Sequence, residues 1–244
     1  MRTILLSIEY DGTDYAGWQI QPDCTTVQDV VEAALTKIVG NPVRIHSSSR
    51  TDAGVHARCM AAHFKTDSKV PLSAFREGAN SHLPEAVAIR QVREMPEDFH
   101  ARFSAKSKKY RYSIYQGEVR SPLSCKTSWH LYKTLDLELM REAASHLVGQ
   151  HDFQAFRSSN CVAKTTTREI FQVDVSSAGE FVYLDFHGSR FLKNMVRMLV
   201  GTLVEVGQGK RSPDELRALL AGEDGVQRGP TAPARGLCLQ EVLY

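Results

Sequence analysis

Hydrophobic and polar positions alternate with two different periods along the first hundred residues, and these periods predict six elements. Thr3–Tyr10 alternates loosely and stops at an Asp-Gly-Thr turn, which is typical of a strand. Apolar residues recur at helical spacing in Thr26–Val39, with Thr25 and Gln28 as the expected capping box and Gly40 as the stop. The same reasoning predicts a helix at Leu72–His82 and strands at Val43–Ser47, Val55–Thr66 and Ala86–Val92.

The order of elements repeats in the second half of the chain. The pattern predicts strands at Lys108–Tyr115, Thr166–Val175, Phe181–His187 and Leu237–Leu243, and helices at Leu137–Val148, at Arg190–Val206 and after Ser212-Pro213. Strand-helix-strand-strand-helix-strand is the split ferredoxin-like order. We therefore expect an α+β fold of two ferredoxin-like halves, 1–104 and 105–244, whose antiparallel sheets meet at a central cleft open to a long substrate.

Composition narrows the class of protein. The chain has 244 residues, 42% of them hydrophobic and 24% charged, as in an ordinary globular protein. Its net charge of +2 is small, so a nucleic-acid surface would have to come from local clustering of cations. The five cysteines are scattered and never form Cys-x-x-Cys, which argues against a disulfide framework and a zinc site. No apolar run resembles a signal peptide or a membrane span, so we expect a cytoplasmic protein.

The loop between the second and third predicted strands carries a candidate reactive carboxylate, Asp52. Arg50 lies two residues away, and a neighbouring cation favours the ionised form of a carboxylate. The small pair Ala53-Gly54 leaves room for a ligand, and an ionised carboxylate can act as a nucleophile or a base. The alternative is a plain Asp-containing turn between two strands.

Basic and aromatic residues interleave on the predicted strand that begins near Lys108. Alternation places Lys108, Tyr110 and Tyr112 on one face and Lys109 and Arg111 on the other. An aromatic ring beside cations suits a base to be stacked and phosphates to be neutralised. An ordinary half-buried strand with packed tyrosines and solvated lysines explains the same pattern.

Arg197 lies beside the apolar stripe of the predicted helix Arg190–Val206. A cation at this position is costly to bury unless a carboxylate meets it, and Asp52 is a candidate partner. The alternative is an arginine whose stem covers the edge of the core while its head stays hydrated.

The segment Arg50-Thr51-Asp52-Ala53-Gly54-Val55-His56-Ala57 resembles the signature of the tRNA pseudouridine synthase A family, although Ser48 and Ser49 stand where that family usually has Ala and Gly. Further stretches resemble the same family along nearly the whole chain. They are Tyr10-Asp11-Gly12-Thr13, Gly17-Trp18-Gln19, Phe99-His100-Ala101-Arg102-Phe103-Ser104, His151-Asp152-Phe153, Ala232-Pro233-Ala234 and Gly236-Leu237.

The resemblance implies a function and roles for three residues. It implies isomerisation of uridine to pseudouridine at positions 38 to 40 of the tRNA anticodon stem-loop, without metal or cofactor. Asp52 is then the nucleophile, Tyr110 stacks on the substrate, and Arg197 pairs with Asp52. The resemblance also implies a homodimer that binds one tRNA across both subunits. We expect phosphate contacts from Arg50, Lys109, Arg111, Arg190 and Lys193.

Two other classes of protein are worth comparing. A non-catalytic RNA-binding protein would use the same cleft and stacking aromatics, and would tolerate Asp52→Asn. A metal-dependent hydrolase would use His46, Asp52, His56 and His63, although no His-Glu-x-x-His spacing supports it.

Overall fold

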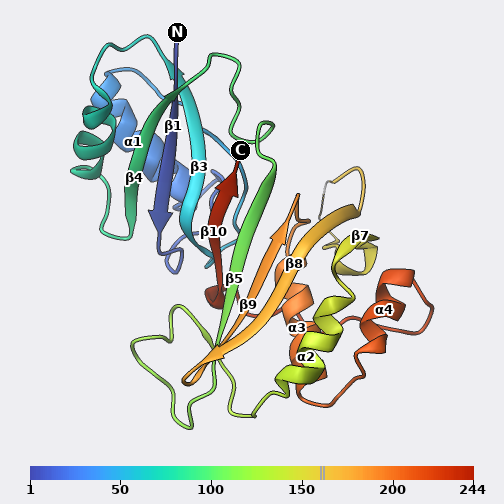
Figure 1. Cartoon of the computed structure of the whole chain (residues 1–244). Coiled ribbons are helices and arrows are strands. Elements are labelled where there is room, and N and C mark those ends of the chain that lie inside the picture. Colours follow the sequence, from blue (N-terminus) through green and yellow to red (C-terminus); the bar gives the residue numbers. More distant parts are fainter. Residues whose placement is uncertain (160, 162) are drawn as a thin grey trace. The chain divides into compact units, whose positions relative to one another are not determined.

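The computed structural model describes residues 1–159, 161 and 163–244, and their contacts form two compact units (Figure 1). Unit 1 comprises Met1–Lys106 and Cys238–Tyr244, and unit 2 comprises Ser107–Leu237. Both contain helices and strands, so the predicted α+β class is confirmed. The units differ from the predicted ranges 1–104 and 105–244, since the last strand of the chain belongs with unit 1.

Unit 1 is a sheet with helical segments packed on it. The strands β1, β3 and β4 are antiparallel neighbours, and β3 also pairs with β2 and β10 at different places. β2 lies antiparallel to β3 at His46↔His63, and β10 lies parallel to it at Cys238↔His56. The elements are β1 (Arg2–Tyr10), α1 (Val27–Val39), β2 (His46–Ser47), β3 (His56–Thr66), the π-helical η1 (Ala74–Gly78), β4 (Val87–Met95) and β10 (Leu237–Leu243).

Burial in unit 1 follows the periods read from the sequence. On β1, Ile4, Leu6 and Ile8 are fully buried, as the strand period of two requires. On α1, Val27, Val31 and Leu35 form the buried stripe of the helix. The two sets of side chains form much of the core of this unit.

The predicted capping box of α1 is wrong by one residue. Thr26 is the N-cap: its Oγ1 accepts a hydrogen bond from the Asp29 N–H at 3.3 Å and donates to the Asp29 carboxylate at 2.7 Å. At the other end Gly40 adopts φ +81°, so the predicted glycine stop is confirmed.

The predicted strand Val43–Ser47 is reduced to the two residues of β2. The Val43 N–H donates to Thr36 Oγ1 at 3.1 Å, and the Ile45 N–H donates to the Glu32 carboxylate at 2.9 Å. Because side chains of α1 accept hydrogen bonds from these two N–H groups, the groups are not available to pair with a neighbouring strand, and the strand is shorter than predicted.

In unit 2, β9 pairs antiparallel with both β5 and β8, and β7 pairs antiparallel with β8. The short β6 adds to β5 in parallel, and α2 contacts α3 and β8. The elements are β5 (Ser107–Tyr115), β6 (Trp129–His130), α2 (Leu137–Ser145), β7 (Gly149–Asp152), η2 (Gln154–Phe156), β8 (Thr167–Ala178), β9 (Phe181–Gly188), α3 (Met195–Gly207), α4 (Asp214–Ala221) and η3 (Ala234–Gly236).

The predicted helix Arg190–Val206 begins later than expected. Asn194 adopts the left-handed conformation at φ +60°, which interrupts a right-handed helix, so α3 begins at Met195. β6 and β7 were not predicted, because strands of two and four residues carry too little alternation to be recognised. None of the described helices is both long and apolar enough to cross a bilayer.

Candidate active site

The loop that carries Asp52 connects β2 to β3 and is held by the end of β1 and by the loop that follows it. Tyr10 Oη and Thr51 Oγ1 share a hydrogen bond of 2.7 Å, and the Trp18 N–H donates to the Thr51 carbonyl at 3.1 Å. On the other side, the Val55 N–H donates to the Asp52 carbonyl at 3.1 Å. The backbone is thus fixed immediately before and after Asp52, whose side chain is half-buried.

Glycines allow the two loops to lie this close together. Gly17 adopts φ +94°, and a Cβ atom there would lie 2.7 Å from the Thr51 carbonyl oxygen. Gly54 adopts φ +76°, which only glycine adopts readily, and its N–H donates to the Tyr15 carbonyl at 3.4 Å. The motif Gly17-Trp18-Gln19 therefore helps to set the position of the Asp52 backbone, a role that its sequence alone did not reveal.

His56 is buried beneath this loop and serves it as a hydrogen-bond acceptor. The Gly12 N–H donates to His56 Nδ1 at 3.1 Å. Asp11 Oδ1 lies 3.1 Å from the same nitrogen, but one Nδ1 cannot accept and donate at once. The Gly12 N–H is aimed at Nδ1, so Nδ1 accepts this hydrogen bond. This hydrogen bond gives His56 a structural role, because it ties the start of β3 to the loop that follows β1.

The metal-site alternative receives no geometric support. Among the residues that the structure describes, no three His, Cys, Asp or Glu side chains gather closely enough to hold a metal ion. His63, another member of the predicted set, is buried, and its Nδ1 faces the His46 carbonyl at 3.1 Å and the Ala101 N–H at 3.2 Å.

In unit 2, Tyr110 lies on β5 opposite Phe186 of β9 and is 7% exposed. Its ring meets the Phe191 ring edge-on, with 5.2 Å between centroids. Lys108, Tyr110 and Tyr112 are all buried, so the predicted shared face of β5 is confirmed.

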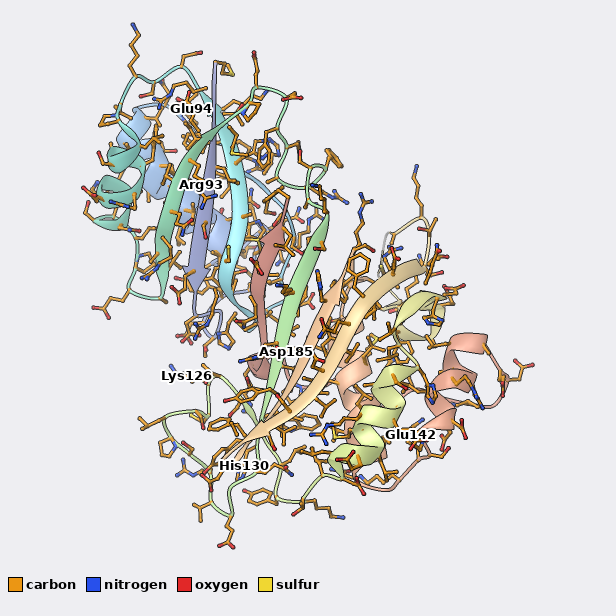
Figure 2. All side chains as sticks on the ribbon, in the orientation of Figure 1. Arg93, Glu94, Lys126, His130, Glu142 and Asp185 are labelled. Carbon is orange, nitrogen blue, oxygen red and sulfur yellow. The ribbon has the colours of Figure 1, made fainter. Side chains whose placement is uncertain are left out.

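The opposite face of β5 carries Arg111 in an ion pair. Arg111 donates from Nε and Nη2 to the two carboxylate oxygens of Asp185, each at 2.8 Å, and its guanidinium lies 4.8 Å from the Tyr183 ring centroid. Asp185, which is labelled in Figure 2, lies on β9. It is directly opposite Arg111 in the strand register. An RNA phosphate at this position would have to share the guanidinium with Asp185.

Arg197 is oriented by a segment that comes much later in the chain. Its Nε donates to the Ala232 carbonyl at 2.7 Å, its Nη1 donates to Asn194 Oδ1 at 3.1 Å, and the Ala232 N–H donates back to the Arg197 carbonyl at 3.0 Å. The Asn194 turn before α3 and Ala232 thus hold the guanidinium from two sides. An arginine whose head is only hydrated would not need these two hydrogen bonds to the protein.

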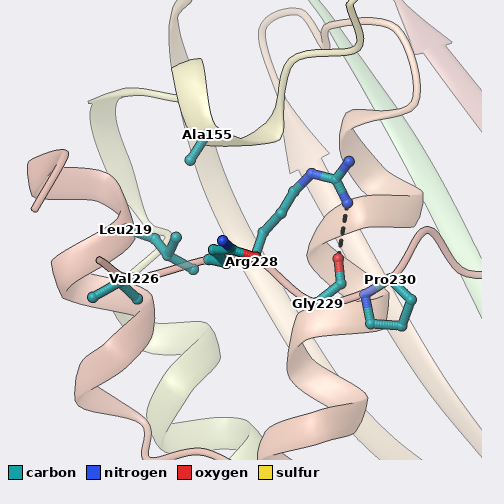
Figure 3. Close-up of a pocket in the computed structure, with 7 residues that line it drawn as sticks. Ala155, Leu219, Val226, Arg228, Gly229 and Pro230 are labelled. Atoms are coloured by element: carbon teal, nitrogen blue, oxygen red, sulfur yellow. Dashed lines mark hydrogen bonds between the residues drawn. The ribbon is translucent and has the colours of Figure 1, made fainter. Parts of the chain in front are cut away.

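We call residues 228–236 the strap, because they pack across α3 and β5. Figure 3 shows its beginning beside α3, where Arg228 Nη1 donates to the Gly229 carbonyl at 2.8 Å. The Gly229 N–H donates to Thr202 Oγ1 of α3 at 3.0 Å, and Tyr112 Oη of β5 donates to the Pro233 carbonyl at 2.8 Å. Burial raises the pKa of Tyr112, which keeps its hydroxyl a donor at all ordinary pH values.

The candidate site residues are divided between the units. Asp52 and Arg50 lie in unit 1, whereas Tyr110 and Arg197 lie in unit 2. The predicted pairing of Asp52 with Arg197 joins the two units and stays a prediction. Of the expected phosphate contacts, Arg50, Arg190 and Lys193 are exposed, and Lys109 and Arg111 are half-buried.

Comparison with known proteins identifies the family to which this site belongs. A family model described as tRNA pseudouridine synthase matches residues 6–104 and 143–244, which include Asp52 and Arg197. The chain belongs to the tRNA pseudouridine synthase family. The predicted family and enzyme class, a pseudouridine synthase and hence an isomerase, are confirmed.

Relatives of the chain are similar over its whole length. A tRNA pseudouridine synthase A from Syntrophotalea carbinolica is 59% identical and covers 100% of this chain and 97% of its own. One from Geotalea uraniireducens is 57% identical, and one from Brevibacillus brevis is 44% identical, both with 100% coverage of the two chains. The similarity therefore includes residues 105–142, which carry Tyr110 and lie outside the match to the family model.

Proposed function

We propose that this pseudouridine synthase isomerises uridine at positions 38, 39 and 40 in the anticodon stem-loop of tRNA. The observation that carries the proposal is the full-length similarity to tRNA pseudouridine synthase A. The fixed, half-buried position of Asp52 in its loop supports it, since a nucleophile has to be held in one place and remain within reach of a ligand.

The proposed chemistry needs only the residues of the chain. The bond between uracil N1 and ribose C1′ breaks, and a bond between uracil C5 and C1′ forms. C5 loses its proton and N1 gains one, so nothing external is consumed. Asp52 is the nucleophile, Arg197 favours its ionised form, and Tyr110 holds the base while it turns over.

The rest of the proposal concerns how the tRNA is bound and how its target base reaches the site. We infer that the two units are ferredoxin-like halves around a central RNA-binding cleft, and that a cytoplasmic homodimer binds one tRNA. The uridine is flipped out of its stack at a cost on the order of a few kcal/mol. Phosphate contacts from Arg50, Lys109, Arg111, Arg190 and Lys193 offset that cost.

The deciding experiment uses tRNA that carries tritium at uracil C5. The wild-type protein releases tritium without any added cofactor and in the presence of EDTA. Asp52→Asn retains tRNA binding and releases none, whereas Asp98→Asn, which alters an exposed carboxylate in another loop of unit 1, keeps the wild-type rate. A wild-type protein that binds tRNA and releases no tritium would be a non-catalytic binder.

The homodimer has its own test. Variants that make the protein monomeric, as judged by sedimentation, are expected to lose tritium release because the bound tRNA spans both subunits. A monomer with full activity would contradict this part of the proposal and leave the chemistry of Asp52 untouched.

A further inference from the structure

The motif Phe99-His100-Ala101-Arg102-Phe103-Ser104 has no role in the proposed chemistry, yet it presents an unusual surface. The motif lies in the connection between β4 and β5, at the end of the first segment of unit 1 (Figure 1). Phe103 is 68% exposed, whereas Phe99 is 8% exposed. An aromatic side chain so open to water suggests a binding partner.

Phe103 is the outermost ring of a row of contacting rings that starts in the core. The His63 ring, only 3% exposed, meets the His100 ring edge-on at 63° with 4.6 Å between centroids, and the His100 ring lies 4.3 Å from that of Phe103 at a tilt of 34°. His46 lies beside both histidines, at 5.4 Å from His63 and 5.8 Å from His100. We call His63, His100 and Phe103 the aromatic stack.

The turn that carries the aromatic stack is held by hydrogen bonds on several sides. The Ala101 N–H lies 3.2 Å from His63 Nδ1, the Arg102 N–H donates to His100 Nδ1 at 3.1 Å, and the Ser104 N–H donates to the His100 carbonyl at 2.9 Å. Tyr244 Oη, from the other end of the chain, donates to the Ala101 carbonyl at 2.9 Å. The stack is therefore organised before any ligand arrives.

The charges around the stack suit an anionic ligand with flat rings. Burial lowers the pKa of His63 to about 4, and burial also lowers the pKa of His100, so both rings are neutral at pH 7. The Arg102 guanidinium lies 5.7 Å from the Phe103 ring centroid. Neutral aromatic rings with one cation over the outermost of them suit a nucleobase that stacks and a phosphate that pairs with the cation.

We propose that Phe103, supported by His100 and His63, stacks on an unpaired base of the RNA substrate while Arg102 contacts the adjoining phosphate. The inference rests on the proposed function for the identity of the RNA. The exposed neighbours of Phe103 favour this occupant over a second protein surface, because Arg102, Ser104 and Lys106 are polar or cationic. An apolar docking surface would need more apolar area than one ring provides.

The test measures the affinity for unmodified tRNA and the steady-state kinetics of C5 tritium release. Phe103→Ala is expected to weaken tRNA binding about tenfold and to raise KM while kcat is kept, and Phe103→Tyr is expected to restore both. Phe171→Ala is the matched control, because Phe171 is 42% exposed and its ring lies 5.1 Å from that of His187 in unit 2. This control is expected to leave binding unchanged.

Three results would overturn the proposal. The first is wild-type affinity in Phe103→Ala. The second is an altered sedimentation coefficient with unchanged tRNA affinity, which would assign the ring to contact with a second copy. The third is weakened binding that accompanies a lower melting temperature and is not restored by Phe103→Tyr, which would make the role structural. A wild-type protein inactive in tritium release but dependent on Phe103 for binding would contradict the proposed function and leave the stack intact.

Discussion

His63 combines burial with a titratable ring, and this combination makes the stability of unit 1 depend on pH. Its ring lies among His46, His100 and Phe99 and is almost inaccessible to water. Burial, reinforced by the neighbouring His100, lowers the pKa of His63 to about 4 in the folded protein. In the unfolded chain the ring returns to the ordinary histidine value of about 6.5.

Between these two pKa values the unfolded state binds a proton at His63 that the folded state does not. The free energy of unfolding is therefore expected to fall by about 2–3 kcal/mol as the pH decreases from about 6.5 to about 4. Urea unfolding at pH 7.0 and pH 4.5 measures this difference. His63→Gln, which cannot titrate, is expected to lose part of the slope; an identical slope in the variant would contradict the assignment.

Gly17 offers a second test at the scale of one residue. Gly17→Ala places a Cβ atom 2.7 Å from the Thr51 carbonyl oxygen in a left-handed conformation, so the Asp52 loop has to move. We expect at least a tenfold loss of tritium release, because small displacements of a reactive group are costly.

Gly40→Ala is the matched control for Gly17→Ala. Gly40 also has a positive φ, +81°, but nothing lies within 4 Å of the position that its Cβ atom would take. It should cost about 1 kcal/mol of stability and leave the rate of tritium release unchanged. Equal losses of activity in the two variants would show that backbone strain alone, without contact with the Asp52 loop, explains the effect.

At the scale of elements, the sequence and the structure differ over which residue caps the start of α1. Thr25 and Thr26 are adjacent hydroxyl residues, and either satisfies the sequence rule for an N-cap. The choice is made by the chain around them. The Ala16 N–H donates to the Thr25 carbonyl at 3.0 Å and the Val27 N–H donates to the Gly17 carbonyl at 3.2 Å, so the segment enters the helix at Thr26.

Thr26→Ala is expected to destabilise the protein by about 1 kcal/mol, since the Asp29 N–H loses its acceptor. Thr25→Ala should change the free energy of unfolding by less than about 0.5 kcal/mol, because Thr25 is exposed and does not cap the helix. Chemical denaturation of the two variants measures the difference. A larger loss of stability in Thr25→Ala than in Thr26→Ala would support Thr25 as the N-cap and contradict the assignment to Thr26.

At the scale of the whole molecule, the first and last segments of the chain fold into the same unit. Cys238 and Leu239 of β10 pair with His56 and Ala57, the residues that follow the Asp52 loop. The end of the chain therefore supports the beginning of β3. The hydrophobic pattern of each segment predicts a strand, but it does not show which distant strand will pair with it.

Leu239→Ala tests this arrangement. Leu239 is fully buried, and its truncation is expected to cost about 2–5 kcal/mol. Hydrogen exchange should become faster in β1 and β3, whereas the β8 and β9 amides of unit 2 keep their protection. Equal acceleration in β8 and β9 would contradict the division of the chain into two separately stabilised units.

The candidate site was predictable to the extent that its residues lie in continuous motifs. Asp52 and Arg197 were predicted from Arg50–Ala57 and from the apolar stripe around Val196, and their roles stay predictions. The shared face of Lys108, Tyr110 and Tyr112 followed from strand alternation and is confirmed. The support of these residues was not predictable. Ala232 orients Arg197 from 35 positions away, and Gly17 sets the backbone beside Asp52 through a contact between loops.

The sequence by itself determined the periods of the elements, the glycine stop after α1 and the signature of the family, because each depends on residues close together in the chain. The tertiary structure decided where β2 is cut short, where α3 begins, which unit receives β10 and which rings stack beneath Phe103. These outcomes depend on hydrogen bonds and packing between distant segments, and a donor such as the Ile45 N–H takes whichever acceptor the folded chain brings to it.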